Sequence, residues 1–487
     1  MPIFSLDSGY GIGDFGESAY AFVDFLKSAG QSFWQILPLV ETDLGNSPYS
    51  SVYSRSFNPL LISPVLLQKA GLLTKLELAS FKLKAKRVNY GLVYENKQKM
   101  LSLAFTKRDK LKGYAEFINS REFLDYALFK AISEKSGYKP LSEWDDGLKF
   151  KNKSAISKFK KENSKRIEYF RFVQFVAKTQ WQTLKKYANE NKVKIFGDIP
   201  IYASKGSVDV WCNPKLFKLN LDLSPTKVAG VPPDYFCEDG QLWGNPVYEY
   251  SAHKQNDYTF FKSKLKHALG IYDIVRIDHF RAFDRFYEID VRETTAKNGE
   301  WVDAPGKEII NALGFAKNKI IAEDLGMIDD GVRELLRYSN YPGMKVLSFA
   351  YDGNSENTHL PEKAEENSVC YTGTHDNDTL KGFISSLNEG EFLNLIKGVN
   401  KSALRLGVKS RAKSIDGLIS CIIKLGSASK SRLFIVPLSD YLKEGSEFRI
   451  NTPGTVGDFN WSIIVPKSRL KKALAKKIKA ISLSYKR

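Results

Sequence analysis

The chain has 487 residues, of which 43% are hydrophobic, and carries a formal net charge of +18 at pH 7. This length and apolar content allow one large domain or two to three smaller ones. No apolar run approaches a membrane span, and no basic segment with an apolar signal core begins the chain, so we expect a cytoplasmic protein. The four cysteines and five histidines lack the spacing of a disulfide framework or a metal site. We therefore expect no cofactor and no metal.

The positive charge raises a nucleic-acid partner as an alternative, because lysine-rich surfaces attract phosphate. The basic runs, residues 149–165 and 467–487, lie in predicted surface helices with few aromatic residues between the lysines. A solvated lysine-rich surface is therefore the simpler interpretation.

Near the amino terminus, a short apolar strand is predicted within residues 1–9, followed by Gly11-Ile-Gly-Asp-Phe-Gly16 and a helix over residues 17–29. The hexapeptide has the G-x-G-x-x-G pattern of dinucleotide-binding turns. However, the strand is very short, and a long Ser-, Tyr- and Asn-rich loop follows the next predicted strand, residues 31–39. These features favour a tight loop at a strand end over dinucleotide binding.

That Ser-, Tyr- and Asn-rich loop contains Tyr49. Loops of this composition bind neutral hydroxylated ligands through hydrogen bonds and ring faces, although ordinary turn chemistry also explains them. From residue 64 to 192 the pattern is helical and charged, with helical apolar periodicity over residues 167–187, and we expect an inserted helical subdomain.

The next predicted strand, residues 194–200, contains Asp198 near its end and leads into a region rich in Gly, Pro, aromatic and amide residues. A loop of this length is uncommon in a compact domain unless it serves a site. We expect residues 203–250 to form an irregular, substrate-binding region. Trp243 is its candidate ligand platform, with a buried packing role as the alternative.

Residues 273–283, DIVRIDHFRAF, contain a predicted buried strand whose end carries Arg276 and Asp278. Because side chains alternate along a strand, these two point to the same side. A cation and a carboxylate are costly to bury unless they pair or serve a function. For this strand alone, a structural ion pair and a catalytic role are both open.

The same arrangement recurs at later strands, where IAEDLG presents Glu323 and TGTHDND presents His375 and Asp376. About eight predicted strands, mostly separated by helices, indicate an α/β fold of the (β/α)8 TIM-barrel type, with catalytic groups at the carboxyl ends of the strands. We expect residues 1–63 to begin this barrel, 64–192 to form the helical insertion and 193–487 to complete the barrel.

Four acidic strand ends on one rim would repel each other unless a cationic species is expected there, and Arg276 offsets only part of the charge. In the absence of metal-ligand spacing, this arrangement favours glycoside cleavage through an oxocarbenium-like transition state. The four residues are Asp198, Asp278, Glu323 and Asp376.

The segments GIGDFG, SPYSS, GVPPDYF with GQLWGNPVY, RIDHFRAF, IAEDLG and TGTHDND follow each other along the chain. Together they resemble the 4-alpha-glucanotransferases of glycoside hydrolase family 77, the amylomaltases or disproportionating enzymes of the alpha-amylase clan. The resemblance runs from about Gly9 to Trp461. It implies transfer of α-1,4-glucan segments from a donor maltooligosaccharide to an acceptor by a retaining double displacement. A retaining α-1,4-glucan hydrolase is the alternative, and a non-catalytic glucan- or nucleic-acid-binding protein is a more distant one.

By this resemblance Asp278 is the nucleophile, Glu323 the general acid/base and Asp376 the carboxylate that stabilises the transition state. A retaining mechanism places the nucleophile and the acid about 5 Å apart. Proximity to Asp278 and Asp376 is expected to raise the pKa of Glu323, and Arg276 to keep Asp278 ionised. Substrate contacts are expected from Tyr49, Asp198, Trp243, Arg276, His375 and Asn451.

For Tyr49 and Asn451, a purely structural role in their loops is the alternative, and His279 is assigned no role. Two departures from the family pattern stand out. The predicted first strand is short, and Gly457-Asp-Phe-Asn-Trp461 stands where Gly-Asn-Trp is usual, so the local ending of the barrel is expected to differ. Transfer requires that the covalent intermediate be shielded from water, and residues 230–248 are the candidate covering loop.

Overall fold

The computed structural model describes residues 1–43, 45–233 and 238–487; residues 234–237 of the predicted substrate loop, including Cys237, lie outside the described residues. In the described part, seven parallel strands form two sheets, with the orders β1-β2-β5-β8 and β11-β10-β9. Ala322 N donates to Pro342 O at 2.9 Å where the two sheets meet. The strands are Phe33–Gln35 (β1), Lys194–Ile199 (β2), Ile274–Ile277 (β5), Ile320–Ala322 (β8), Gly343–Val346 (β9), Ser368–Tyr371 (β10) and Leu433–Ile435 (β11).

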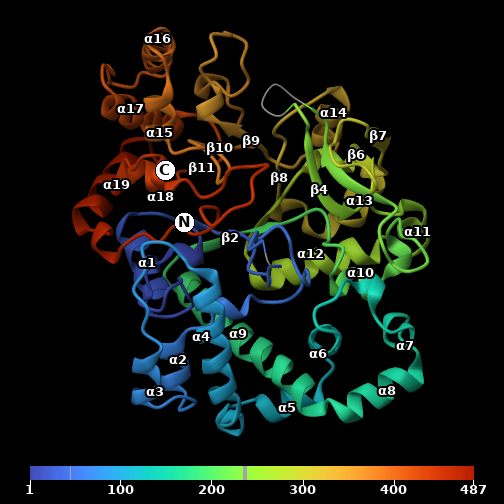
Figure 1. Ribbon diagram of the computed structural model, residues 1–487. Helices are drawn as coiled ribbons and strands as arrows, with labels where there is room; N and C mark the ends of the chain where they lie inside the picture. The colour runs from blue at the N-terminus through green and yellow to red at the C-terminus, as the bar shows by residue number, and fades with distance from the viewer. Residues whose placement is uncertain (44, 234–237) are drawn as a thin grey trace.

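Helices surround these strands and fill the lower part of Figure 1, where the 64–192 segment lies. The amino-terminal helix α1 and the carboxyl-terminal helix α19 pack on each other. The helices are Glu17–Ser28 (α1), Pro64–Lys69 (α2), Lys75–Ser80 (α3), Tyr90–Phe105 (α4), Tyr114–Asn119 (α5), Leu124–Lys135 (α6), Asp146–Lys149 (α7), Lys153–Glu162 (α8), Ser164–Glu190 (α9), Val208–Cys212 (α10), Tyr250–Gln255 (α11), Thr259–Ile271 (α12), Gly306–Ala312 (α13), Asp330–Ser339 (α14), Leu380–Ser386 (α15), Glu389–Arg405 (α16), Ile415–Ala428 (α17), Leu438–Leu442 (α18) and Lys472–Ser484 (α19).

The strand predicted within residues 1–9 is wrong, because Ile3–Ser5 form a turn of 3₁₀ helix. Ile3 and Leu6 are each 2% exposed, so both side chains must reach the core. Positions three apart share a side in a 3₁₀ turn but lie on opposite faces of a strand. The 3₁₀ turn therefore buries both side chains on one side, and a single parallel bridge joins Leu6 to Val465.

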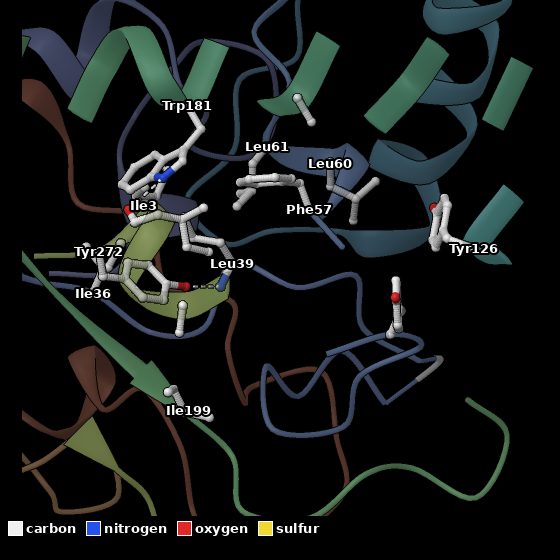
Figure 2. Close-up of a cluster of buried hydrophobic side chains, with 14 of the residues drawn as sticks. Ile3, Ile36, Leu39, Phe57, Leu60, Leu61, Tyr126, Trp181, Ile199 and Tyr272 are labelled. Carbon is white, nitrogen blue, oxygen red and sulfur yellow. Dashed lines mark hydrogen bonds between the residues drawn. The ribbon is translucent and has the colours of Figure 1, made fainter. Parts of the chain in front are cut away.

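The long helix α9 shares its core with the barrel. Its buried Trp181 donates from Nε1 to the carbonyl oxygen of Ile271, at 3.0 Å, and lies near Tyr272, whose hydroxyl accepts a hydrogen bond from Leu39 N at 3.1 Å (Figure 2). One continuous set of buried apolar residues extends from the 64–192 segment into the parallel strands.

Two buried glutamines of α9 join it to residues 57–63. Gln174 accepts from Phe57 N at 2.7 Å and donates to Phe57 O at 2.9 Å. Gln180 accepts from Ser63 N at 2.7 Å and donates to Ser63 O at 3.3 Å. Because buried backbone groups need partners, this glutamine clamp allows an irregular segment to cross the interior.

The expectation that residues 203–250 are irregular is wrong in part. Lys227–Val231 (β3) and Gln241–Pro246 (β4) pair with Arg285–Asp290 (β6) and Glu300–Asp303 (β7) in an antiparallel sheet of order β4-β3-β6-β7, at the upper right of Figure 1. Gly230 lies inside β3, and because glycine is uncommon in strands, the sequence did not predict this one. Only glycine fits at this position, because a Cβ would lie 2.2 Å from Gln241 O on the neighbouring strand.

The glycine pattern at residues 11–16 serves close packing. A Cβ at Gly13 would lie 1.9 Å from Ile3 O and 2.7 Å from Leu6 N, and Gly13 N donates to Phe4 O at 2.8 Å. The turn at residues 11–16 thus packs closely against the 3₁₀ helix Ile3–Ser5. The prediction of a tight loop is confirmed, but the loop follows a 3₁₀ turn and not the end of a strand.

We expect Gly13→Ala to destabilise the protein by about 1–3 kcal/mol, because the added methyl group must displace backbone atoms. The urea midpoint of unfolding measures this loss. Gly270→Ala is the matched control, since a Cβ there meets no atom within 4 Å in helix α12 and alanine favours a helix by up to about 1 kcal/mol. Equal midpoints for Gly13→Ala and the unchanged protein would contradict the packing argument.

Candidate active site

Arg276, at the end of β5, is the cation to which two of the site's carboxylates, Asp198 and Asp278, are bound. Its Nε donates to both oxygens of Asp198 at 3.0 and 3.1 Å, and its Nη2 donates to Asp198 Oδ2 at 2.8 Å and to Asp278 Oδ1 at 2.6 Å. Arg276 and Asp198 are each 3% exposed. The guanidinium's fixed fork therefore connects the carboxyl end of β2 with that of β5.

Tyr49 joins the same network from the loop after β1. Its hydroxyl donates to Asp198 Oδ2 at 2.6 Å and accepts from Arg276 Nη2 at 3.0 Å. Its ring stacks on His375, with centroids 5.1 Å apart and planes at 14°. The structure thus holds Tyr49 in place through both its hydroxyl and its ring.

Glu323 follows β8, and main-chain donors fix its carboxylate. Oε2 accepts from His279 N at 2.7 Å and Oε1 accepts from Leu325 N at 2.9 Å. Burial raises the pKa of Glu323 to about 7, against the opposing effect of Arg276 and of these two donors. The expected direction is confirmed, but the main cause is burial rather than proximity to Asp278 and Asp376.

Burial also raises the pKa of Asp278 well above that of an ordinary aspartate, and the charges of Asp198, Glu323 and Asp376 add to the shift. Arg276 opposes the shift without reversing it. The expectation that Arg276 keeps Asp278 ionised is right in the direction of the Arg276 effect, but burial and the neighbouring carboxylates outweigh it in the net shift of the Asp278 pKa. Because Asp278 and Glu323 influence each other, they titrate as a pair.

Asp376 and His375 lie on the loop after β10. Asn451 Nδ2 donates to Asp376 Oδ1 at 2.6 Å, and Asn451 N donates to His375 O at 3.1 Å. Arg449 Nη2 donates to Asp376 O at 2.7 Å. Burial lowers the pKa of His375, so its ring, with Nε2 3.3 Å from Asp376 Oδ2, is neutral at pH 7. Asn451 therefore touches the predicted catalytic residue directly.

Trp243 is placed by β4, a strand that the sequence did not predict. Its side chain is 37% exposed, so the alternative of a buried packing residue does not describe it. Its ring meets His279 edge to face, with centroids 4.8 Å apart.

His279, which sequence reasoning left without a role, connects two parts of the site. Its backbone φ is +50°, in the left-handed region, and this turn presents its N–H to Glu323. Few non-glycine residues adopt this conformation, although histidine is among those enriched in it. No pattern in a single sequence indicates such a turn.

Trp461 was also missed as a site residue. Its buried ring lies 5.7 Å from His375 and 6.0 Å from Tyr49, centroid to centroid, and its φ is +59°. The sequence contained one indication, because Trp461 ends the segment that departs from the family pattern. The structure brings that segment's last residue into the wall of the site.

Within residues 1–43, 45–233 and 238–487, no group of His, Cys, Asp and Glu side chains has the arrangement of a metal site. Over the same ranges, every helix is too short or too polar to cross a bilayer.

Residues 1–468 match the family model described as 4-alpha-glucanotransferase. The chain belongs to the 4-alpha-glucanotransferase family. The 4-alpha-glucanotransferase of Clostridium butyricum is 38% identical over 495 residues, which cover 100% of this chain and 99% of that relative. That of Aquifex aeolicus is 41% identical over 471 residues, which cover 95% and 94%.

Among solved structures, the amylomaltase from Streptococcus agalactiae in complex with acarbose superposes with a TM-score of 0.93 at 35% identity, covering 100% of this chain and 98% of that one. The predicted family, the barrel-type α/β fold and a glucan-transferring enzyme are confirmed. The hydrolase and the glucan- or nucleic-acid-binding alternatives find no support in these 4-alpha-glucanotransferase relatives.

Arg276→Gln is expected to lower the free energy of unfolding by about 3–5 kcal/mol, because it leaves Asp198 buried without its cation. Chemical denaturation measures the loss. Arg333→Gln is the matched control, since its pair with Asp330 is 58% and 98% exposed and such pairs contribute about 0–1 kcal/mol. A similar loss of unfolding free energy in the two variants would show that the buried network stabilises the protein no more than an exposed ion pair does.

Proposed function

We propose that this enzyme moves α-1,4-glucan segments from a donor maltooligosaccharide to the 4-hydroxyl of an acceptor glucan or glucose by a retaining double displacement. One observation carries the residue assignment. The N–H of His279, the residue next to Asp278, donates to Glu323, so the two carboxyl groups lie at adjacent strand ends. A close pair of carboxyl groups with unequal surroundings is what retention of configuration requires.

In the first step, Asp278 attacks the anomeric carbon while Glu323 gives its proton to the departing glycosidic oxygen. The bond from the anomeric carbon to that oxygen breaks, and a glycosyl ester of Asp278 forms. In the second step, Glu323 takes the proton of the acceptor's 4-hydroxyl, whose oxygen attacks the anomeric carbon and releases Asp278. Both half-reactions use the same proton carrier.

The remaining predicted residues have supporting roles in this proposal. Asp376, held by Asn451 and beside neutral His375, binds sugar hydroxyls and stabilises the positive charge of the transition state. The buried Arg276 and Asp198, with Tyr49, fix Asp278 and border the sugar that is transferred. Exposed Trp243 offers a flat apolar face to the acceptor.

Transfer rather than hydrolysis depends on the acceptor's occupying the site before water does. The antiparallel sheet supports this part of the proposal, because β4 holds Trp243 against His279, the residue beside the nucleophile. An acceptor sugar on Trp243 would exclude water from the face of the intermediate that reacts.

We expect incubation with maltotriose to give a ladder of longer maltooligosaccharides together with glucose, resolved by chromatography over time. The reason is that an acceptor sugar, not water, completes the second step. Maltose and glucose alone, without longer chains, would establish the hydrolase alternative.

The same assay tests the residue assignments. Asp278→Asn, Glu323→Gln and Asp376→Asn should each lower the rate by at least about 100-fold while leaving the circular dichroism spectrum unchanged. Asp330→Asn, on an exposed surface pair, is the control that should retain full activity. Near-normal turnover in any of the three variants would remove that residue from its role.

The rate should fall as the pH rises through about 7, because Glu323 must be protonated in the first step and its pKa is raised to about 7. On the acid side, the fall should begin above the ordinary aspartate range, because Asp278 must be ionised and its pKa is raised. Values of kcat/KM, obtained from initial rates between pH 4 and 9, measure the falls on both the acid and the alkaline side. An alkaline fall that persists unchanged in Glu323→Gln, with fluoride release from α-maltosyl fluoride as the readout, would assign it to another group.

A cytoplasmic location is part of the proposal. It is supported by the three cysteines of the described ranges, Cys212, Cys370 and Cys421, which are free thiols.

A further inference from the structure

Asp440 is a buried carboxyl group outside the network around Arg276. It lies on the short helix α18, is 2% exposed, and none of the ion pairs found among the described residues includes it. Burial raises its pKa to about 6, and the charge of Asp378 adds to the shift. A carboxyl group without a cationic partner is costly to bury, so its contacts call for an explanation.

Those contacts lie at the two ends of one loop. Thr372, the first residue after β10, donates from Oγ1 to Asp440 Oδ2 at 2.6 Å. Leu380, the first residue of α15, donates from its backbone N to Asp440 Oδ1 at 2.9 Å. Both hydrogen bonds are buried. One carboxylate thus fixes where the loop leaves the barrel strand and where it enters the next helix.

The loop between these two points, residues 373–379, carries His375 and Asp376. Within it, Thr374 N and Oγ1 donate to Asn377 Oδ1 at 2.8 and 3.0 Å. These internal bonds give the loop a shape of its own, and Asn451, Arg449 and Ser446 contact its middle and its end. The internal bonds do not tie the two ends of the loop to each other, whereas Asp440 on α18 bonds to both ends.

We propose that Asp440 is a positioning residue that sets the place of Asp376 and His375 in the active site by holding Thr372 and Leu380. The proposal rests on the function proposed above for Asp376. Misplacement of a reacting group by about 1 Å can lower a rate by about 100-fold. Asp440 acts through the loop and does not touch the sugar.

The test compares Asp440→Ala with Asp440→Asn. The amide of asparagine can accept from Leu380 N and donate to Thr372 Oγ1, so it retains both contacts, whereas alanine removes both. We expect kcat for maltotriose disproportionation to fall about 100-fold in Asp440→Ala and less than about 5-fold in Asp440→Asn. We also expect the Kd for acarbose, measured by calorimetry, to rise about 10-fold in the alanine variant only.

Asp273→Ala is the matched control. Asp273 also accepts a backbone N–H, that of Ile195, at 2.7 Å, but at the amino end of β2, away from the strand ends that carry the site. It should lower the thermal midpoint and leave kcat unchanged. An equal loss of kcat in Asp273→Ala and Asp440→Ala would show that the loss in Asp440→Ala comes from general destabilisation, and would overturn the proposal.

A second pair keeps the test decisive if Asp440→Ala does not fold. Thr372→Val removes only the hydroxyl group, and Thr372→Ser restores it. We expect a loss of kcat of about 10-fold in the valine variant and recovery in the serine variant; unchanged kcat and acarbose affinity in Thr372→Val would overturn the proposal. If the unchanged protein makes no transfer products, the proposed function fails, and the acarbose affinities alone then decide the role of Asp440.

Discussion

The site depends on the burial of one cation between two carboxylates. Arg276 connects Asp198 on β2 with Asp278 after β5; Arg276 and Asp198 can be removed from water only together, while the Asp278 side chain stays 28% exposed. The alternatives posed for this strand, a structural ion pair and a catalytic role, therefore do not exclude each other. The pair with Asp198 is structural, and it fixes the geometry of the contact with Asp278.

Around this centre, the protein places one carboxyl group per strand end and gives each a different environment. Asp278 faces a guanidinium, Glu323 accepts two main-chain N–H groups, and Asp376 faces an amide. Differences of this kind separate the roles of chemically similar groups. The barrel brings the carboxyl groups close together, and the different neighbours of each group give it a different role.

Much of this arrangement could be predicted from local sequence. Ile274–Ile277 was expected as a strand and is one. Asp278 and Glu323 were expected at strand ends because they directly follow short apolar runs, and Asp376 because it follows one a few residues later. The predictions failed where long-range contacts decide the structure. Gly230 hid a strand whose need for glycine arises from the neighbouring strand. His279 and Trp461 enter the site through left-handed backbone turns, which leave no mark in the pattern of apolar residues.

The glutamine clamp has a consequence for how the chain is made. Gln174 and Gln180 each bond to residues 117 positions earlier, at Phe57 and Ser63. During synthesis, the backbone N–H and C=O groups of Phe57 and Ser63 lack these glutamine partners until α9 has left the ribosome. Contacts of such long sequence separation form late and slowly. We therefore expect residues 57–63 to complete their buried hydrogen bonds only after the helical segment is present, so the assembly of this part of the barrel depends on that segment.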